Sequence, residues 1–278
     1  MKLVSFSSAD GKVRPGVLLE ERNMVVDLSD GYADTLAVIT AGLTSVDDLG
    51  PHASHPMDTV RLHAPLGNPP RIFAIGLNYR DHAAESGMAV PTTPVVFFKL
   101  TTAIIGPGDA IVLPKNSSEP DYEAEFAFVI GKGGYRIAAT SWRDHVYGYT
   151  IVNDVSARDV QFATSQWSMS KSFPTFCPMG PSIVSADEIL DPHALAIGLS
   201  IDGEVLQYSN TRELVFGVPA LIEHLSSITP LLPGDIVSTG TPPGVGLGRT
   251  PKRWLKPGEN VSVTIAGLGS LTNPVAAE

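Results

Sequence analysis

The segment from Asp121 to Gly131 carries two glutamates within an apolar stretch that is typical of a buried strand. Side chains two residues apart lie on the same face of a strand, so Glu123 and Glu125 are expected side by side. Carboxylates next to an apolar core lose hydration and repel each other, and a divalent cation such as Mg²⁺ or Mn²⁺ relieves both effects. The alternative is a solvated strand face without a metal. The apolar residues that continue to Ile130 favour the metal site.

A second strand is predicted from Val146 to Asp154 by its aromatic and β-branched residues. It brings a third carboxylate, Asp154, to a strand end, where a rigid scaffold can present functional groups. Ser156–Gln161 is typical of a helix start, so an N-cap role for Asp154 is the alternative. Helical spacing would place Arg158 and Gln161 on a common side.

Six stretches of the chain resemble the fumarylacetoacetate hydrolase family in its bacterial two-part form, and they occur in the family's order. They are Gly76–Glu85, Asp121–Glu125, Asn153–Gln161, Lys171–Phe173, Ser209–Arg212 and Thr239–Gly246. Each stretch is short, but together they are specific and extend over residues 70 to 278. The resemblance implies an α+β, β-rich fold, in which a mixed β-sandwich roll forms the catalytic part and a small N-terminal domain precedes it.

The resemblance also implies the members of the site. The metal, Mg²⁺ or Mn²⁺ with Ca²⁺ as an alternative occupant, would be bound by Glu123, Glu125 and Asp154. The catalytic residues would be His82 and Glu85, as a pair on a mobile lid, and Lys171. The substrate, a small keto acid, would contact Arg158, Gln161, Thr241 and Tyr79. The family's assembly would be a homodimer.

Physical arguments support two of these roles. On a helix, Glu85 lies one turn after His82 and can hold its imidazole and raise its basicity, whereas an ordinary surface pair is the alternative. Residues 86–88, Ser-Gly-Met, offer the flexible exit that a lid needs. Three carboxylates and one divalent cation leave a negative site, so an anionic substrate requires further cations. Lys171 and Arg158 would supply them, Arg158 through two hydrogen bonds to a carboxylate.

A glycine-rich loop, a proline and a cysteine complete the candidate features. The loop Gly240–Gly248 is glycine-rich but lacks the Gly-Lys-Ser/Thr of a phosphate-binding loop. Its backbone amides and the Thr241 hydroxyl are expected to bind a carboxylate instead. Pro174 stands where an acidic or polar residue is expected in many relatives, and it is expected to alter the distal pocket. Cys177 has no base near it in sequence and is expected to pack in the core.

Two domains are predicted, residues 1–68 and 69–278, joined by the turn-rich segment His63–Pro70. The first is expected to hold strands at Met1–Phe6, Arg14–Glu20 and Met24–Leu28, and short helices at Tyr32–Gly42 and Val46–Leu49. The second is strand-rich, with Pro-Gly turns at 107–108, 233–234 and 257–258. Its clearest helical periodicity covers Glu213–Ser226.

The chain has 278 residues, 43% hydrophobic content and a formal net charge of −10. This composition supports a substantial core and excludes disorder, and the negative charge disfavours nucleic acid as a partner. A single cysteine permits no intrachain disulfide, and the first residues turn polar too early for a signal peptide. No apolar run is long enough to span a membrane. A cytoplasmic protein without a membrane partner is therefore expected.

These features predict a Mg²⁺- or Mn²⁺-dependent hydrolase that cleaves a carbon–carbon bond of a 2,4-diketo acid to give pyruvate and a carboxylic acid. The resemblance supplies this substrate class, an acylpyruvate such as fumarylpyruvate or maleylpyruvate, or a diketo-deoxy sugar acid. His82 and Glu85 would activate water, and Lys171 would help stabilise the enolate. One alternative is an oxaloacetate-type decarboxylase or a 2-hydroxy-dienoate isomerase with the same metal-bound enolate. The other is a non-catalytic protein that binds small anions.

Overall fold

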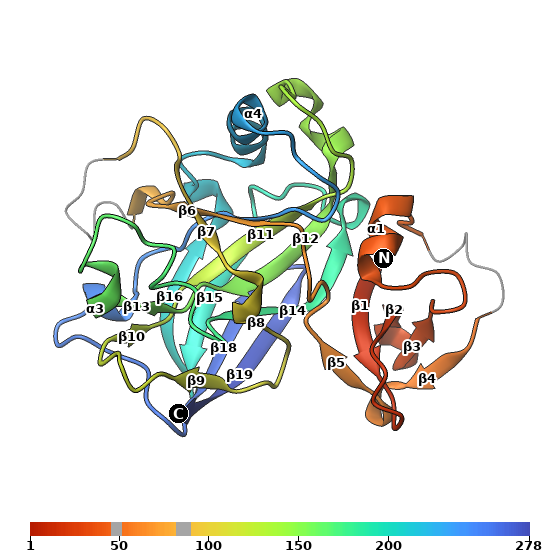
Figure 1. Cartoon of the computed structure of the whole chain (residues 1–278), viewed down its shortest axis with the longest axis horizontal. Helices are drawn as coiled ribbons and strands as arrows, with labels where there is room; N and C mark the ends of the chain where they lie inside the picture. The colour runs from red at the N-terminus through yellow and green to blue at the C-terminus, as the bar shows by residue number, and fades with distance from the viewer. Residues whose placement is uncertain (46–51, 82–89) are drawn as a thin grey trace.

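A computed structural model describes residues 1–45, 52–81 and 90–278 (Figure 1). The larger sheet of the described chain runs in the order β4-β3-β2-β1-β14-β12-β11-β17-β6-β7, with β5 paired to β1 and β8 paired to β14. Its strands are β1 Lys2–Ser7, β2 Arg14–Leu19, β3 Met24–Asp27, β4 Ser54–Pro56, β5 Arg61–His63, β6 Ile72–Gly76, β7 Val95–Lys99, β8 Ile104–Ile105, β11 Ala124–Ile130, β12 Val146–Asn153, β14 Cys177–Ser185 and β17 Ile236–Ser238.

A second sheet has the order β16-β15-β18-β19-β9, and two short strands, β10 and β13, pair separately. These strands are β9 Ile111–Leu113, β10 Pro120–Asp121, β13 Ser156–Ala157, β15 Ala196–Ile201, β16 Glu204–Asn210, β18 Asn260–Ile265 and β19 Gly269–Ala277. Apolar side chains of β11 and β12 share one buried cluster with those of β15 and β18. The predicted α+β, β-rich sandwich is confirmed, because these two sheets pack face to face around that cluster.

The α-helices of the described chain are few and short: α1 Thr35–Ala41, α3 Arg158–Gln161 and α4 Val218–Ile228. α1 lies within the predicted span and begins at Asp34, whose carboxylate accepts a hydrogen bond from the Ala37 amide. The helix predicted at 213–226 begins instead at Val218, because Gly217 is its extended N-cap residue and proline occupies the first turn. The helix predicted at Val46–Leu49 lies outside the described residues. No described helix has the length and apolar character needed to cross a membrane.

The three strands predicted near the N-terminus are confirmed as β1, β2 and β3. β1 also pairs with β14, with Leu3 opposite Ile183, so the large sheet crosses the predicted boundary at residue 68. Figure 1 shows the N-terminal strands and α1 to one side of the remaining chain, next to β14. The N-terminal part and the strands β11 and β12 therefore belong to one continuous sheet.

Candidate functional site

Three buried carboxylates meet where β11 and β12 lie side by side. β12 pairs antiparallel with β11 so that Ala124 lies opposite Asn153, and the residues next to this pair are Glu123 and Asp154. The Asp154 amide donates a hydrogen bond of 2.9 Å to the Glu123 carbonyl. Glu123, Glu125 and Asp154 each offer a carboxylate oxygen within 4.8 Å of the others. Strand pairing thus brings together the three residues that were expected as metal ligands.

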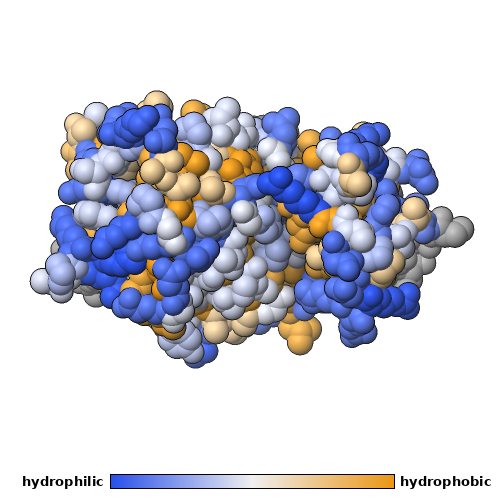
Figure 2. Space-filling model, turned by 90° about the horizontal axis from the view of Figure 1, so that it is seen from below, coloured by the Kyte–Doolittle hydropathy of each residue, from blue (hydrophilic) through white to orange (hydrophobic). Residues whose placement is uncertain are grey.

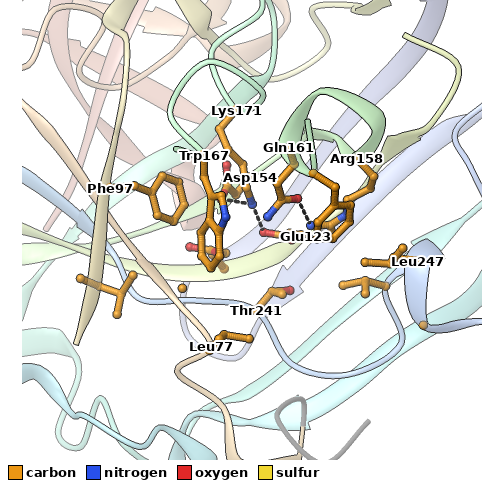
Figure 3. Close-up of a pocket in the computed structure, with 16 residues that line it drawn as sticks. Leu77, Phe97, Glu123, Asp154, Arg158, Gln161, Trp167, Lys171, Thr241 and Leu247 are labelled. Atoms are coloured by element: carbon orange, nitrogen blue, oxygen red, sulfur yellow. Dashed lines mark hydrogen bonds and ion pairs between the residues drawn. The ribbon is translucent and has the colours of Figure 1, made fainter. Parts of the chain in front are cut away.

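Three buried cations surround this cluster, and Figure 3 labels two of them, Lys171 and Arg158. The Lys171 ammonium donates to Glu123 Oε2 at 2.6 Å and to Asp154 Oδ2 at 2.8 Å. Lys99 Nζ donates to the other Asp154 oxygen, Oδ1, at 2.6 Å. The Arg158 Nη2 atom donates to Glu123 Oε1 at 2.6 Å. Each oxygen of Glu123 and Asp154 therefore has a cationic partner in this structure.

Glu125 differs from the other two carboxylates because its described hydrogen bonds come from neutral donors. The Ser238 hydroxyl lies 2.5 Å from Glu125 Oε2, and the Gly240 amide lies 3.0 Å from the same oxygen. Burial, together with the charges of Asp154 and Glu123, raises the pKa of Glu125 well above its usual range. In this buried and negatively charged surrounding, the Glu125 carboxyl group is stable only when it is protonated or paired with a further cation.

Glu123 and Lys171 keep their charge. Burial alone would raise the pKa of Glu123, but Lys171 and Arg158 lower it to about 2. Burial alone would lower the pKa of Lys171, but the charges of Asp154 and Glu123 raise it above its ordinary value. The donor set therefore fits a divalent cation, because three carboxylates converge and Glu125 has no direct ion pair with a cation among the described residues.

The carboxylate cluster lies in a cavity of about 450 Å³. Of the expected substrate contacts, Arg158, Gln161 and Thr241 line it. Arg158 Nη1 donates to Gln161 Oε1 at 2.8 Å, which confirms that the two side chains point to a common side. The Thr241 hydroxyl accepts a hydrogen bond of 2.9 Å from Gln207 Nε2. Whether these residues contact substrate stays a prediction.

Tyr79 does not belong to the described lining of this cavity. It is fully buried and bridges to Leu214, and its hydroxyl has no hydrogen-bond partner within the described part of the chain. Burial and the charge of Glu125 raise its pKa, so the phenol stays protonated. His82 and Glu85, the expected catalytic pair, lie outside the described residues, and so does the predicted flexible exit at 86–88.

The structure excludes the alternative role of Asp154 and corrects the expectation for Pro174. Asp154 is not an N-cap residue: α3 begins after Ala157, and the Asp154 carboxylate accepts hydrogen bonds from two lysines. The chain pairs as β13 before it turns into α3, which moves the helix start beyond the reach of Asp154. Pro174 is exposed and is not a described lining residue, so it does not shape this cavity.

The glycine-rich loop binds carboxylates of the protein itself. The Gly246 and Leu247 amides donate to the two oxygens of Asp121 at 2.7 and 3.0 Å, and the Gly240 amide donates to Glu125. Asp121 also accepts 2.8 Å hydrogen bonds from Arg158 Nε and from the Tyr122 amide. These bonds lie within the chain, and whether the loop and the Thr241 hydroxyl also bind a substrate carboxylate stays a prediction.

Sequence reasoning missed three site residues. The Lys99 side chain is completely buried and forms an ion pair with Asp154. The sequence feature that could have indicated it is a lysine at the end of the apolar strand Val95–Lys99. Asp121 was noted only as part of a motif, although it ties Arg158 to the glycine loop. Trp167 lines the cavity, and no pattern in its polar surroundings indicated this. Cys177 is buried as expected, and burial raises the pKa of its thiol to about 12.

Comparison with known proteins agrees with this geometry. Residues 71–276 match the family model described as Fumarylacetoacetate (FAA) hydrolase C-terminal. The chain is 42% identical over 291 residues to the protein named Oxaloacetate tautomerase fahd2, mitochondrial, of Xenopus laevis, which covers 99% of this chain and 90% of the relative.

Two solved structures extend the comparison. The 5-carboxymethyl-2-hydroxymuconate delta-isomerase from Mycobacterium smegmatis matches with a TM-score of 0.82 at 35% identity, over 100% of both chains. The maleylpyruvate hydrolase from Sphingobium sp. SYK-6, solved in complex with manganese(II) ion and pyruvate, matches with a TM-score of 0.83 at 29% identity, over 100% of this chain and 99% of that chain. Because the family model covers most of the sequence and the fold agrees along its whole length, the chain belongs to the fumarylacetoacetate hydrolase family, an enzyme family with hydrolase, isomerase and tautomerase members.

Proposed function

We propose that this chain catalyses divalent-metal-dependent keto–enol interconversion of a 2-keto acid, with oxaloacetate as the first substrate to test. The observation that carries the proposal is the Lys171 ammonium, buried against Glu123 and Asp154 at the edge of the three-carboxylate cluster. The 42% identity to a protein named as an oxaloacetate tautomerase supports the choice of substrate.

Glu123, Glu125 and Asp154 would hold the metal, and a bound divalent cation would act as a Lewis acid toward the keto group. Lys171 stays protonated and would stabilise the negative charge that develops on the 2-keto oxygen as the C3 proton leaves. Arg158 holds Glu123, and Lys99 holds Asp154, so neither carboxylate can turn away from the cluster. In the full reaction one proton leaves C3 and one proton is added to the 2-keto oxygen.

A second candidate is hydrolysis of an acylpyruvate, the reaction predicted from the sequence. Two observations favour it: the whole-chain likeness to a maleylpyruvate hydrolase, and a cavity of about 450 Å³, which exceeds the needs of a four-carbon acid. This reaction requires a base to activate water, and His82 with Glu85 remains the proposed pair.

The test is to follow enol-oxaloacetate decay and acylpyruvate loss in the presence of Mg²⁺, Mn²⁺ or a chelator, with the products identified. Lys171→Met should lower turnover by roughly a hundredfold or more while bound metal, measured by elemental analysis, is retained. Lys12→Met, which removes an exposed lysine from the N-terminal part, is the matched control and should keep full activity. Equal turnover with and without chelator would contradict the proposal, and pyruvate release from acylpyruvates alone would favour the second candidate.

A further inference from the structure

The cavity has a charged floor and apolar walls. Figure 3 shows Lys171, Asp154 and Glu123 together, with Trp167 and Phe97 to one side of them and Leu247 to the other. Val245 and Leu77 also line the cavity. A substrate whose carboxylate and keto oxygens face the floor would therefore direct the rest of its chain between apolar side chains.

No cation of the described lining is left for the far end of a substrate. The lysine and the arginine that line the cavity are Lys171 and Arg158, and both are held by protein carboxylates within hydrogen-bond distance. Residues 82–89, which the structure does not describe, contain neither lysine nor arginine. A carboxylate moved from water to these walls would lose hydration without gaining an ion pair, which is unfavourable.

Trp167 is held in its place by two neighbours. Its indole packs edge-on against Phe97, with ring centroids 5.7 Å apart, and the Phe97 ring lies 5.3 Å from Lys171 Nζ. On the other side, a Cβ atom at Gly76 would lie 2.3 Å from the indole, so only glycine leaves room for the ring. The indole thus forms a wall of the cavity directly beside the charged floor.

We infer that the site prefers 2-keto acids whose chain beyond the fourth atom is uncharged and apolar, and that Trp167 is the residue that determines this preference. The inference rests on the proposed function for the position of the keto-acid head. The four carbons of oxaloacetate would remain over the floor, near Lys171, and any longer substituent would lie against the indole and against Leu247. The ligand class is therefore a 2-keto acid with an alkyl or aryl tail, in contrast to one with a second carboxylate at its far end.

The test uses two unreactive ligands of equal shape, N-isobutyl oxamate and N-oxalylglycine. Both present a carboxylate beside a carbonyl, and they differ in an isopropyl or a carboxylate end. With the metal-loaded protein, calorimetry should give a dissociation constant for N-isobutyl oxamate that is lower by about tenfold or more. Equal affinity, or tighter binding of N-oxalylglycine, would overturn the inference.

Two variants assign the preference to the walls. Trp167→Ala should raise the dissociation constant of N-isobutyl oxamate by about tenfold, because the tail loses its apolar contact. The dissociation constant of N-oxalylglycine should change by less than about threefold. Leu247→Arg places a cation on the opposite wall and should reverse the order of the two ligands. Tyr208→Ala, an exposed aromatic on β16 outside the cavity, is the control and should match the unaltered protein. If Trp167→Ala weakens the binding of both ligands equally, the indole does not select the tail, and Trp167 is not the residue that determines the preference.

This design separates the inference from the proposed function. Oxamate without a tail should bind only in the presence of Mg²⁺ or Mn²⁺. Tail-less oxamate that binds equally in chelator, or does not bind at all, contradicts the keto-acid site itself. Metal-dependent binding of oxamate without discrimination between the two tails contradicts only the inference.

Discussion

At the scale of single residues, the site is a network in which each carboxylate has a different set of partners. Asp121 and Arg158 illustrate this, because together they connect the glycine-rich loop to Glu123, one of the expected metal ligands. Arg158 Nε donates to Asp121, while its Nη2 donates to Glu123. Glu123, an expected metal ligand, is therefore oriented by Arg158, which is not expected to bind the metal itself.

Asp121→Asn should destabilise the protein strongly. The variant removes one of the two carboxylates that pair with the buried Arg158 guanidinium, and it directs an amide NH2 group at other hydrogen-bond donors. Breaking such a buried pair lowers the free energy of unfolding by about 3–5 kcal/mol. Urea unfolding of the metal-free protein measures this free energy. Asp10→Asn, which breaks an exposed pair with Arg14, is the control and should leave the unfolding curve nearly unchanged. Similar effects of the two substitutions would contradict the argument.

Glu125→Gln should stabilise the metal-free protein and abolish its response to metal. The folded pKa of Glu125 is raised, so the unfolded chain loses this proton first as the pH rises. The stability of the metal-free protein should therefore fall with rising pH, from the ordinary carboxyl pKa up to the raised folded value. Melting temperatures in chelator and in Mn²⁺ across this range check the expectation. A melting temperature of Glu125→Gln that still rises with Mn²⁺ would remove Glu125 from the ligand set.

At the scale of elements, the loop between α3 and β14 shows how local contacts position the site. It carries Trp167 and Lys171 alongside β7, an edge strand of the large sheet. The Ser168 and Ser172 hydroxyls accept hydrogen bonds from the Phe98 and Leu100 amides at 3.2 and 3.0 Å. The strand edge is thus covered, and the loop takes its register from it.

The start of α4 should be sensitive to pH through His193. The Val218 amide donates to His193 Nε2 at 3.0 Å, which requires the imidazole to be neutral at that atom. Burial lowers the pKa of His193 more than the nearby Asp191 raises it. The hydrogen bond to His193 therefore contributes its full stability above about pH 6.5, the pKa of a histidine in the unfolded chain. This contribution is lost as the pH falls through the lower pKa of His193 in the folded protein.

His193→Gln should remove this dependence, because glutamine offers an acceptor that does not titrate. Urea unfolding at pH 7.5 and pH 5.5 measures the difference between the two proteins, and the loss of stability on acidification should be smaller in the variant. His224→Gln, a substitution within α4 itself, serves as the control. An unchanged acid response in His193→Gln would mean that other groups cause it.

At the scale of the whole molecule, one sheet extends from the N-terminal strands to the strands β11 and β12 beside the carboxylate cluster. Met1, Leu3 and Val17 share a buried cluster with Met179 and Ile183 of β14. The two predicted domains, residues 1–68 and 69–278, therefore share a strand pairing and a buried apolar cluster. A common core favours unfolding of both parts in one transition.

Leu3→Ala tests this coupling. Leu3 is completely buried, so its truncation should cost about 2–5 kcal/mol. The three tryptophans, Trp142, Trp167 and Trp254, all lie beyond residue 68, so their fluorescence reports on the catalytic part alone. The fluorescence transition should shift to lower denaturant together with the circular dichroism transition. A fluorescence midpoint that stays in place would show that residues 1–68 unfold independently.

The homodimer remains a prediction at this scale. On the face shown in Figure 2, hydrophobic residues emerge in patches between hydrophilic ones. Val205 and Tyr208, 65% and 77% exposed, lie on β16, an edge strand of the second sheet. Light scattering at micromolar concentration should give twice the monomer mass of 29.4 kDa. A monomer mass at that concentration would contradict the prediction.

The sequence by itself determined the strands β11 and β12, because runs of apolar, aromatic and β-branched residues depend only on neighbouring positions. Glu125 lies on β11, Glu123 lies just before this strand and Asp154 lies just after β12. The sequence also determined the family, through short motifs in a specific order. It did not determine the partners of those carboxylates. Lys99 is 55 positions from Asp154, and the amide of Gly246 is 125 positions from Asp121.

Only the tertiary structure decided these pairings, because strand register and loop closure bring such distant residues together. It also moved the start of α4 to Val218 and joined β1 to β14 across the expected domain boundary. The same folding placed Trp167 beside the charged floor of the cavity. Local patterns record which residues prefer burial, whereas the identity of their buried partners depends on contacts between distant parts of the chain.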